Sequence, residues 1–114
     1  MNIPNCERCI VEPEKVRDYL LSLSHPGGKG KAEFFTAMGF QRDAWQVLAE
    51  ALRQVACNCP VTKSMTSRHG RKYIVDGALV TPIGQAALVR TVWIVDAGSD
   101  TPRLVTAYPT AQES

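Results

Sequence analysis

The chain has 114 residues and a mass of 12.5 kDa, which suits one domain that buries roughly two-thirds of the surface of the unfolded chain. Its composition, 45% hydrophobic and 21% charged, excludes a disordered, collagen-like or coiled-coil protein. The net charge of +2 is too small to indicate nucleic-acid binding by itself, so such a partner has to be argued from a local cluster.

The first half of the chain, about residues 12–57, has the apolar spacing of helices. Pro13 suits a first helical turn, because its missing N–H needs no partner there. Gly39 is the predicted left-handed cap of a second helix, and Asp43 with Gln46 resembles the capping box of a third. The three predicted helices run from Pro13 to Ser24, from Gly30 to Met38 and from Asp43 to about Cys57.

The second half, about residues 61–109, changes to the alternating pattern of strands, with turn residues between the alternating segments. Short loops favour antiparallel neighbours. The predicted strands are Val61 to Thr66, Lys72 to Leu79, Ala86 to Val95 and Leu104 to Tyr108. These elements predict a single α+β domain over residues 1–114, in which three N-terminal helices pack on a four-stranded antiparallel sheet. Residues 110–114 are predicted to be a flexible tail.

Four cysteines form two close pairs, Cys6 with Cys9 and Cys57 with Cys59. A zinc ion takes four ligands in a tetrahedron, and the first pair could supply two of them. The second pair and the long segment between the pairs match no strong zinc pattern. The alternative is that the thiols are buried as small apolar side chains, and we prefer this interpretation to a structural zinc site.

Two groups of polar residues lie where packing alone does not require them. One surrounds the glycine-rich entrance of the second helix, where backbone N–H groups and the helix N-terminus favour an anion such as phosphate. The other lies on the last two predicted strands. The groups are His25, Lys29 and Lys31 at the helix entrance, and Arg90, Arg103, Thr106 and Tyr108 on the strands. The spacing is not that of a Walker loop, so binding of a nucleoside triphosphate is not expected.

These residue types fit cleavage of RNA without a metal ion. The reaction needs a base for the 2′-hydroxyl, an acid for the leaving oxygen and fixed cations for the charge that builds on phosphorus. His25 is the predicted proton shuttle, since histidine titrates near neutral pH. We predict catalytic roles for His25, Lys31, Arg90 and Thr106, and substrate contacts for Lys29, Arg103 and Tyr108. No cofactor is expected, and no cluster of ligands for a catalytic metal is visible in the sequence.

Simpler interpretations of the same residues stay open. A histidine before a proline is often a turn residue, and the alternating glycines and lysines suit a solvated loop. In the simpler interpretation Arg90 pairs with a carboxylate and has no other role, and Tyr108 packs at the boundary of the core.

Motifs from Ile3 to Pro109 together resemble a bacterial family, the domain of unknown function 6883. The most specific are HPxGxxKAxFF at residues 25–35 and RLVTAYP at residues 103–109. The order of helices followed by a sheet is also similar to the barnase, EndoU, colicin and RelE-like group of metal-independent ribonuclease toxins. That resemblance implies that His25, Lys31, Arg90 and Thr106 fall in places similar to those of the basic and hydroxyl residues of the group.

The sequence therefore predicts a metal-independent endoribonuclease of toxin type, with RNA as its substrate. The alternative is a non-catalytic binding module, such as an immunity or antitoxin-like protein. A small cognate antitoxin or immunity protein is the expected protein partner. No apolar run reaches the roughly 18 residues of a membrane span and the first residues lack the apolar stretch of a signal peptide, so no membrane contact and a cytoplasmic location are expected.

Overall fold

A computed structural model describes residues 1–24 and 29–110, with the backbone alone at Lys29. The helical elements are η1 (Cys6–Arg8), α1 (Pro13–Lys15), η2 (Val16–Leu20), α2 (Lys29–Ala37), η3 (Arg42–Ala44) and α3 (Trp45–Asn58). The strands are β1 (Val61–Ser67), β2 (Gly70–Val80), β3 (Ala86–Asp96) and β4 (Arg103–Pro109). The predicted proton shuttle His25 and residues 111–114 of the predicted tail lie outside the described residues.

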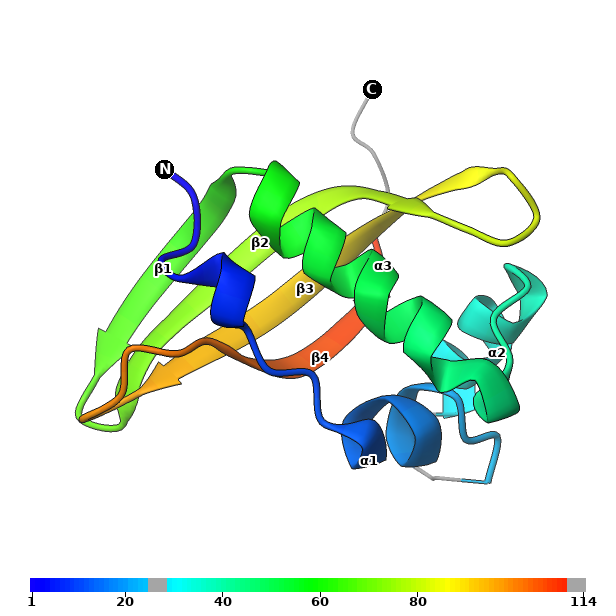
Figure 1. Cartoon of the computed structure of the whole chain (residues 1–114), viewed down its shortest axis with the longest axis horizontal. Coiled ribbons are helices and arrows are strands. Elements are labelled where there is room, and N and C mark those ends of the chain that lie inside the picture. Colours follow the sequence, from blue (N-terminus) through cyan, green and yellow to red (C-terminus); the bar gives the residue numbers. More distant parts are fainter. Residues whose placement is uncertain (25–28, 111–114) are drawn as a thin grey trace.

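The four strands form one antiparallel sheet in the order β1-β2-β3-β4, and α3 crosses one face of it (Figure 1). This confirms the predicted α+β fold, with the helices N-terminal to the sheet. Each strand is one to three residues longer than predicted, because pairing continues into the turns that the sequence pattern assigned to loops. Within the described residues, no helix is both long enough and apolar enough to cross a membrane.

Strand β3 supplies the centre of the core. Val89, Thr91 and Trp93 are fully buried on the face that α3 covers. Val89 and Trp93 belong to one apolar cluster with Leu48 and Leu52 of that helix. Burying a polar group is costly unless it is hydrogen-bonded. The Thr91 hydroxyl donates to the carbonyl oxygen of Val75 (2.8 Å), and the Trp93 indole N–H donates to the Thr91 hydroxyl (2.8 Å). Both polar groups are therefore satisfied inside the core.

The first eleven residues form an N-terminal arm that contains the short turn η1 and lies beside α3 on the same side of the sheet (Figure 1). At its start the Met1 carbonyl oxygen accepts a hydrogen bond from Val61 N of β1 (2.6 Å). At its end Ile10 forms a parallel bridge with Arg103, at the start of β4. The arm therefore joins the two edges of the sheet and leads the chain into α1 beside β4.

Two local predictions for the helices need correction, and one is confirmed. The first helix ends at Leu20 rather than Ser24. The predicted capping box at Asp43 is wrong, because residues 42–44 form a separate 3₁₀ turn and α3 begins after Ala44 without a side-chain cap. Gly39 does cap α2 with a left-handed backbone (φ 97°), which lets its N–H and the next N–H return to carbonyl groups of the last turn.

The tight turn between β1 and β2 depends on Gly70. Its φ is 140°, and a Cβ atom there would lie 2.2 Å from the carbonyl oxygen of Val95 and 2.9 Å from Cα of Asp96. Both are backbone atoms of β3, so they cannot move away as a flexible side chain would. We expect Gly70→Ala to lower the free energy of unfolding by about 2 kcal/mol or more, measured by urea denaturation.

Gly98→Ala is the matched control for this prediction. Gly98 also has a positive φ (83°), but no atom lies within 4 Å of its Cβ position. Only the backbone penalty of about 1 kcal/mol is expected there. If the two variants lost the same free energy of unfolding, the close approach of β3 would not be the reason that residue 70 must be glycine.

Candidate functional site

Four of the predicted site residues meet where η2 and the start of α2 reach strand β4. Arg90 of β3 is the direct cross-strand partner of Tyr108 of β4 and, on its other side, of Asp76 of β2. Thr106 lies two residues before Tyr108, so both side chains point to the same face of the sheet. Lys31 comes from the first turns of α2 and lines a pocket of about 500 Å³ together with Tyr108.

Arg90 is held in place by Asp76. The guanidinium donates from Nε to Oδ1 (2.8 Å) and from Nη2 to Oδ2 (2.9 Å), a two-pronged pairing that fixes its plane. The hydrogen bonds and charge of Asp76, with a further hydrogen bond to Tyr108, raise the pKa of Arg90 above its usual value. The simpler interpretation of Arg90, pairing with a carboxylate, therefore describes its main contact, although about a third of the side chain (35%) stays exposed.

Tyr19 of η2 lies among Lys15, Lys31 and Thr106. It is not one of the site residues predicted from the sequence. The Lys31 Nζ atom lies 5.3 Å from the centre of the Tyr19 ring and the Lys15 Nζ atom lies 5.2 Å from it. Burial raises the pKa of the Tyr19 phenol, but hydrogen bonding to Lys31 and Thr106 and the charges of both lysines outweigh burial, so the pKa lies below its ordinary value.

Thr106 presents a buried hydroxyl to this cluster. Its Oγ1 has no hydrogen bond of ordinary geometry within residues 1–24 and 29–110, although the Tyr19 phenol is near enough for Thr106 to help lower its pKa. Buried polar groups without a full partner are rare and call for an explanation, such as an unoccupied binding position. We call Tyr19, Lys31, Arg90, Thr106 and Tyr108 the β4 cluster.

The remaining predicted site residues are not part of this arrangement in the described chain. Arg103 lies at the opposite end of β4, five residues from Tyr108 or about 15 Å along the strand. Its guanidinium contacts Asp96 (3.2 Å) and Glu12 (4.0 Å). His25 lies outside the described residues, and so does the side chain of Lys29.

The four cysteines do not meet at one point. Cys6, Cys9 and Cys57 line a pocket between η1 and α3. Cys59 lies over β2 instead, where a Cβ atom on Gly77 would be 2.5 Å from its Sγ atom. Among the residues that the structure describes, no three His, Cys, Asp or Glu side chains are arranged to hold a metal ion.

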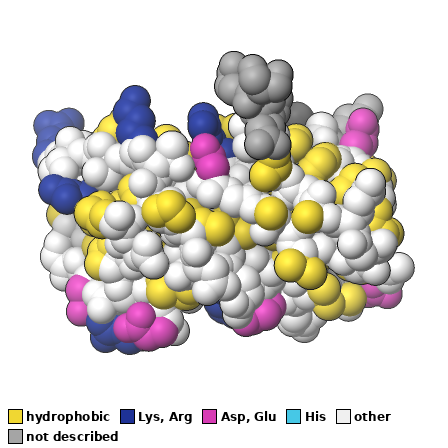
Figure 2. Space-filling view, turned by 90° about the horizontal axis from the view of Figure 1, so that it is seen from above, with side chains coloured by type: hydrophobic (Ala, Val, Ile, Leu, Met, Phe, Trp, Pro, Cys, Tyr) yellow, Lys and Arg dark blue, Asp and Glu magenta, His cyan; other side chains and the backbone are white. Residues whose placement is uncertain are grey.

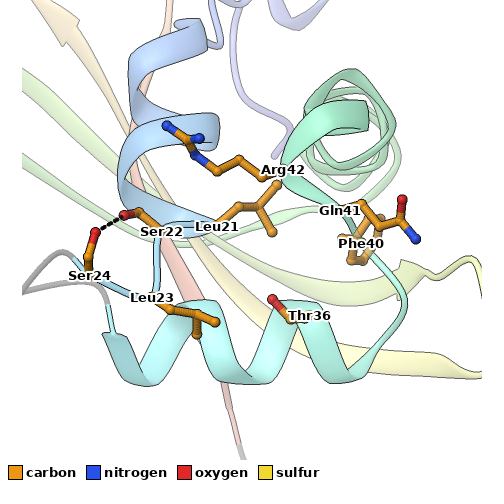
Figure 3. Close-up of a pocket in the computed structure, with 8 residues that line it drawn as sticks. All are labelled: Leu21, Ser22, Leu23, Ser24, Thr36, Phe40, Gln41 and Arg42. Atoms are coloured by element: carbon orange, nitrogen blue, oxygen red, sulfur yellow. Dashed lines mark hydrogen bonds between the residues drawn. The ribbon is translucent and has the colours of Figure 1, made fainter.

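A further pocket of about 540 Å³ lies between residues 21–24, α2 and residues 40–42 (Figure 3). Leu21, Leu23 and Phe40 supply its apolar wall. The charged residue in its lining, Arg42, is engaged elsewhere, since its guanidinium donates to Asp18 (2.7 Å) and to the carbonyl oxygen of Arg17 (3.1 Å). This pocket lacks the grouping of cations and hydroxyls found at β4, so we do not include it in the candidate site.

Comparison with known proteins identifies the family. Residues 2–111 match the family described as Domain of unknown function (DUF6883), and the chain belongs to this family. A chain of the contact-dependent growth inhibition toxin–immunity protein complex from Klebsiella pneumoniae 342 has a similar fold, with a TM-score of 0.71 and 22% identity. The alignment covers 94% of this chain and 97% of that chain. No curated protein matches the sequence.

The low pKa of Tyr19 leads to a testable prediction. In Lys31→Met the hydrogen bond and the charge of Lys31 are both lost while burial remains, so the phenol should titrate at a higher pH than in the native protein. Lys15→Met, which removes a charge alone, should cause a smaller rise. Tyrosinate absorbance and NMR of the labelled ring measure both shifts.

The lowered pKa of Tyr19 also makes the free energy of unfolding depend on pH. Because the folded pKa is lower than the unfolded value near 10.0, ionisation of Tyr19 favours the folded state above that value, and this contribution is lost as the pH falls through the folded pKa. An unchanged titration in Lys31→Met would mean that Lys31 does not influence Tyr19 in solution.

Proposed function

We propose that this member of the DUF6883 family is a metal-independent endoribonuclease of toxin type. The observation that carries the proposal is the β4 cluster, which brings together two tyrosines, a threonine, a lysine and an arginine. Lys31 and Tyr108 of this cluster line a pocket of about 500 Å³. The similar fold of a chain from a toxin–immunity protein complex supports a place in a toxin system.

The chemistry of RNA cleavage assigns a role to each member of the cluster. A phosphate seated between Lys31 and Tyr108 would meet the cationic Nζ atom and a phenol at once. Arg90, oriented by Asp76, would stabilise the charge that develops on the phosphate oxygens. The buried Thr106 hydroxyl would act through Tyr19, whose phenol it helps to orient and whose pKa it helps to lower.

Proton transfer needs a base and an acid near this phosphate. Tyr19 has a lowered pKa and contacts Lys31, which makes it one candidate for a proton carrier. His25, six positions before Lys31 in the chain, is the other, and histidine needs no shift to act at neutral pH. The roles of the two residues are separable by their pH profiles, since loss of the group that titrates removes one limb of the profile.

The sheet face that carries Arg90 offers a path for the rest of an RNA strand. On this face Lys63 lies in the cross-strand row of Ile74 and Val92, and Lys72 lies in the row of Ile94. Both lysines are exposed, and within the described residues neither pairs with a carboxylate. Figure 2 shows several Lys and Arg side chains in the left half of the view, the side on which β1 and the turn between β1 and β2 lie in Figure 1.

The proposal predicts cleavage of RNA in the presence of EDTA, with 2′,3′-cyclic phosphate ends and no cleavage of DNA. Lys31→Met and His25→Ala should each lower kcat/KM by about 10² to 10⁴ while the protein stays folded. Arg90→Gln should cause a loss of about 10² or more, measured with a fluorescent oligoribonucleotide.

Arg8→Gln is the matched control for Arg90→Gln. Arg8 also pairs with an aspartate, Asp100 (3.1 Å), but it lies in η1, away from the β4 cluster. It should retain full activity. Intact RNA after long incubation with excess folded protein, and no growth defect on expression, would favour the alternative, an immunity or antitoxin-like protein that binds a partner without catalysis.

The basic sheet face predicts how binding depends on salt. Neutralising one phosphate of a single strand contributes about −0.7 to the slope of log K against log salt concentration. The double variant Lys63→Gln/Lys72→Gln should therefore bind RNA with a slope that is less steep by roughly 1.4. Fluorescence anisotropy with a non-cleavable 2′-methoxy strand measures this. An identical slope would place the RNA away from β1 and β2.

A further inference from the structure

Three of the four thiols come together at a place that the proposed function does not use. Cys6 of η1, Cys9 immediately after η1, and Cys57 in the last turn of α3 line one pocket of about 560 Å³. Cys6 and Cys57 are half-buried, whereas Cys9 is only 6% exposed and belongs to the core. Thiols of the N-terminal arm and of the end of α3 therefore lie around the same pocket.

Cys6 and Cys57 are the two partly exposed thiols of this pocket. Cys6 is near enough to influence the pKa of Cys57, although the residues are about 50 positions apart in the sequence. Burial raises the pKa of the Cys57 thiol to about 12, and the contact with Cys6 adds to the rise. Burial likewise raises the pKa of Cys9. Burial is the main cause for both groups, so both thiols are protonated at neutral pH.

From the position of these two partly exposed thiols in one pocket we propose that Cys6 and Cys57 form a disulfide by exchange with a small-molecule disulfide, which fastens the N-terminal arm to α3. The choice of pair rests on position. Cys59 lies over Gly77 of β2, on the other side of the helix end, and Cys9 is enclosed by the core.

The exchange is a balanced two-electron oxidation. The Cys6 thiolate attacks one sulfur of the oxidant RSSR, which forms a mixed disulfide and releases RS⁻. Formation of the mixed disulfide removes the smaller contribution of Cys6 to the raised pKa of Cys57, while burial still opposes ionisation, so the second step needs the mildly alkaline pH. Cys57 gives up its proton, attacks the Cys6 sulfur of the mixed disulfide and releases the second RS⁻. The two protons from the protein thiols leave with the two RSH molecules.

The bond would act on a segment that holds both edges of the sheet. The arm accepts a hydrogen bond from β1 through Met1 and bridges β4 through Ile10. A cross-link that closes a loop of about 50 residues restricts the unfolded chain strongly, and the native thiols are already adjacent. We expect the oxidised protein to unfold at a temperature higher by about 5–15 °C than the reduced protein.

The test uses the whole chain, reduced and then incubated with glutathione disulfide at mildly alkaline pH. The expected product is a monomer whose intact mass has fallen by two hydrogen atoms, with one cross-linked peptide pair that contains Cys6 and Cys57. Cys6→Ser and Cys57→Ser should lose both the cross-link and the rise in Tm. Cys59→Ala should keep both, and so should Cys9→Ala.

Three results would overturn the proposal. One is a cross-link that joins Cys57 to Cys9 or to Cys59 in the native chain. Another is a stable mixed disulfide at Cys6 that never resolves in folded protein. The third is a cross-link between Cys6 and Cys57 that forms only after the protein has been unfolded in urea, since the pairing would then owe nothing to the folded contact.

Discussion

The alternation of strand β3 is the constraint on which the rest of the molecule depends. One face of the strand places Thr91 and Trp93 in the core, and the opposite face presents Arg90 to Asp76 and Tyr108. The hydrogen bond from Thr91 to the Val75 carbonyl supports the register of β3 against β2, and the bond from Trp93 to Thr91 ties the indole to the same face of β3. A slip by one residue would exchange the two faces, which would expose the indole and bury the guanidinium. Core and candidate site are thus two results of the same register.

The strands and their faces were predictable because alternation is a local property of the sequence. The helix ends were less so. Asp43 resembles a capping residue, yet a 3₁₀ turn takes up residues 42–44, and Arg42 binds Asp18 on another segment. Tyr19 was missed for a similar reason. Its spacing suits the apolar side of a helix, and only the fold brings Lys31 and Thr106 to its hydroxyl. The i, i+4 spacing of Lys15 and Tyr19 was the one signal in the sequence.

Charge is distributed locally rather than overall. The net charge is +2, but the segment from residue 60 to 75 contains Lys63, Arg68, Arg71 and Lys72 and no acidic residue. By contrast, Arg90 and Arg103 are both paired with carboxylates on neighbouring strands. Paired arginines are oriented and contribute little to the long-range field, whereas unpaired lysines attract an anionic strand from a distance. The sheet face therefore carries exposed lysines on β1 and β2, and on β3 a guanidinium that Asp76 holds in place.

The N-terminal arm connects the edges of the sheet to α1 and η2. Ile10 pairs with the start of β4, and Pro13 begins α1 only three residues later, so the bridge determines where η2 lies against β4. Tyr19 is carried on η2, and its approach to Thr106 depends on that placement. Fastening the arm to α3 at Cys6 would limit how far α1 and η2 can move from the sheet. Cys6 and Cys9 lie on this arm, and after the bridge at Ile10 the chain continues into α1 and then η2, which carries Tyr19 of the β4 cluster.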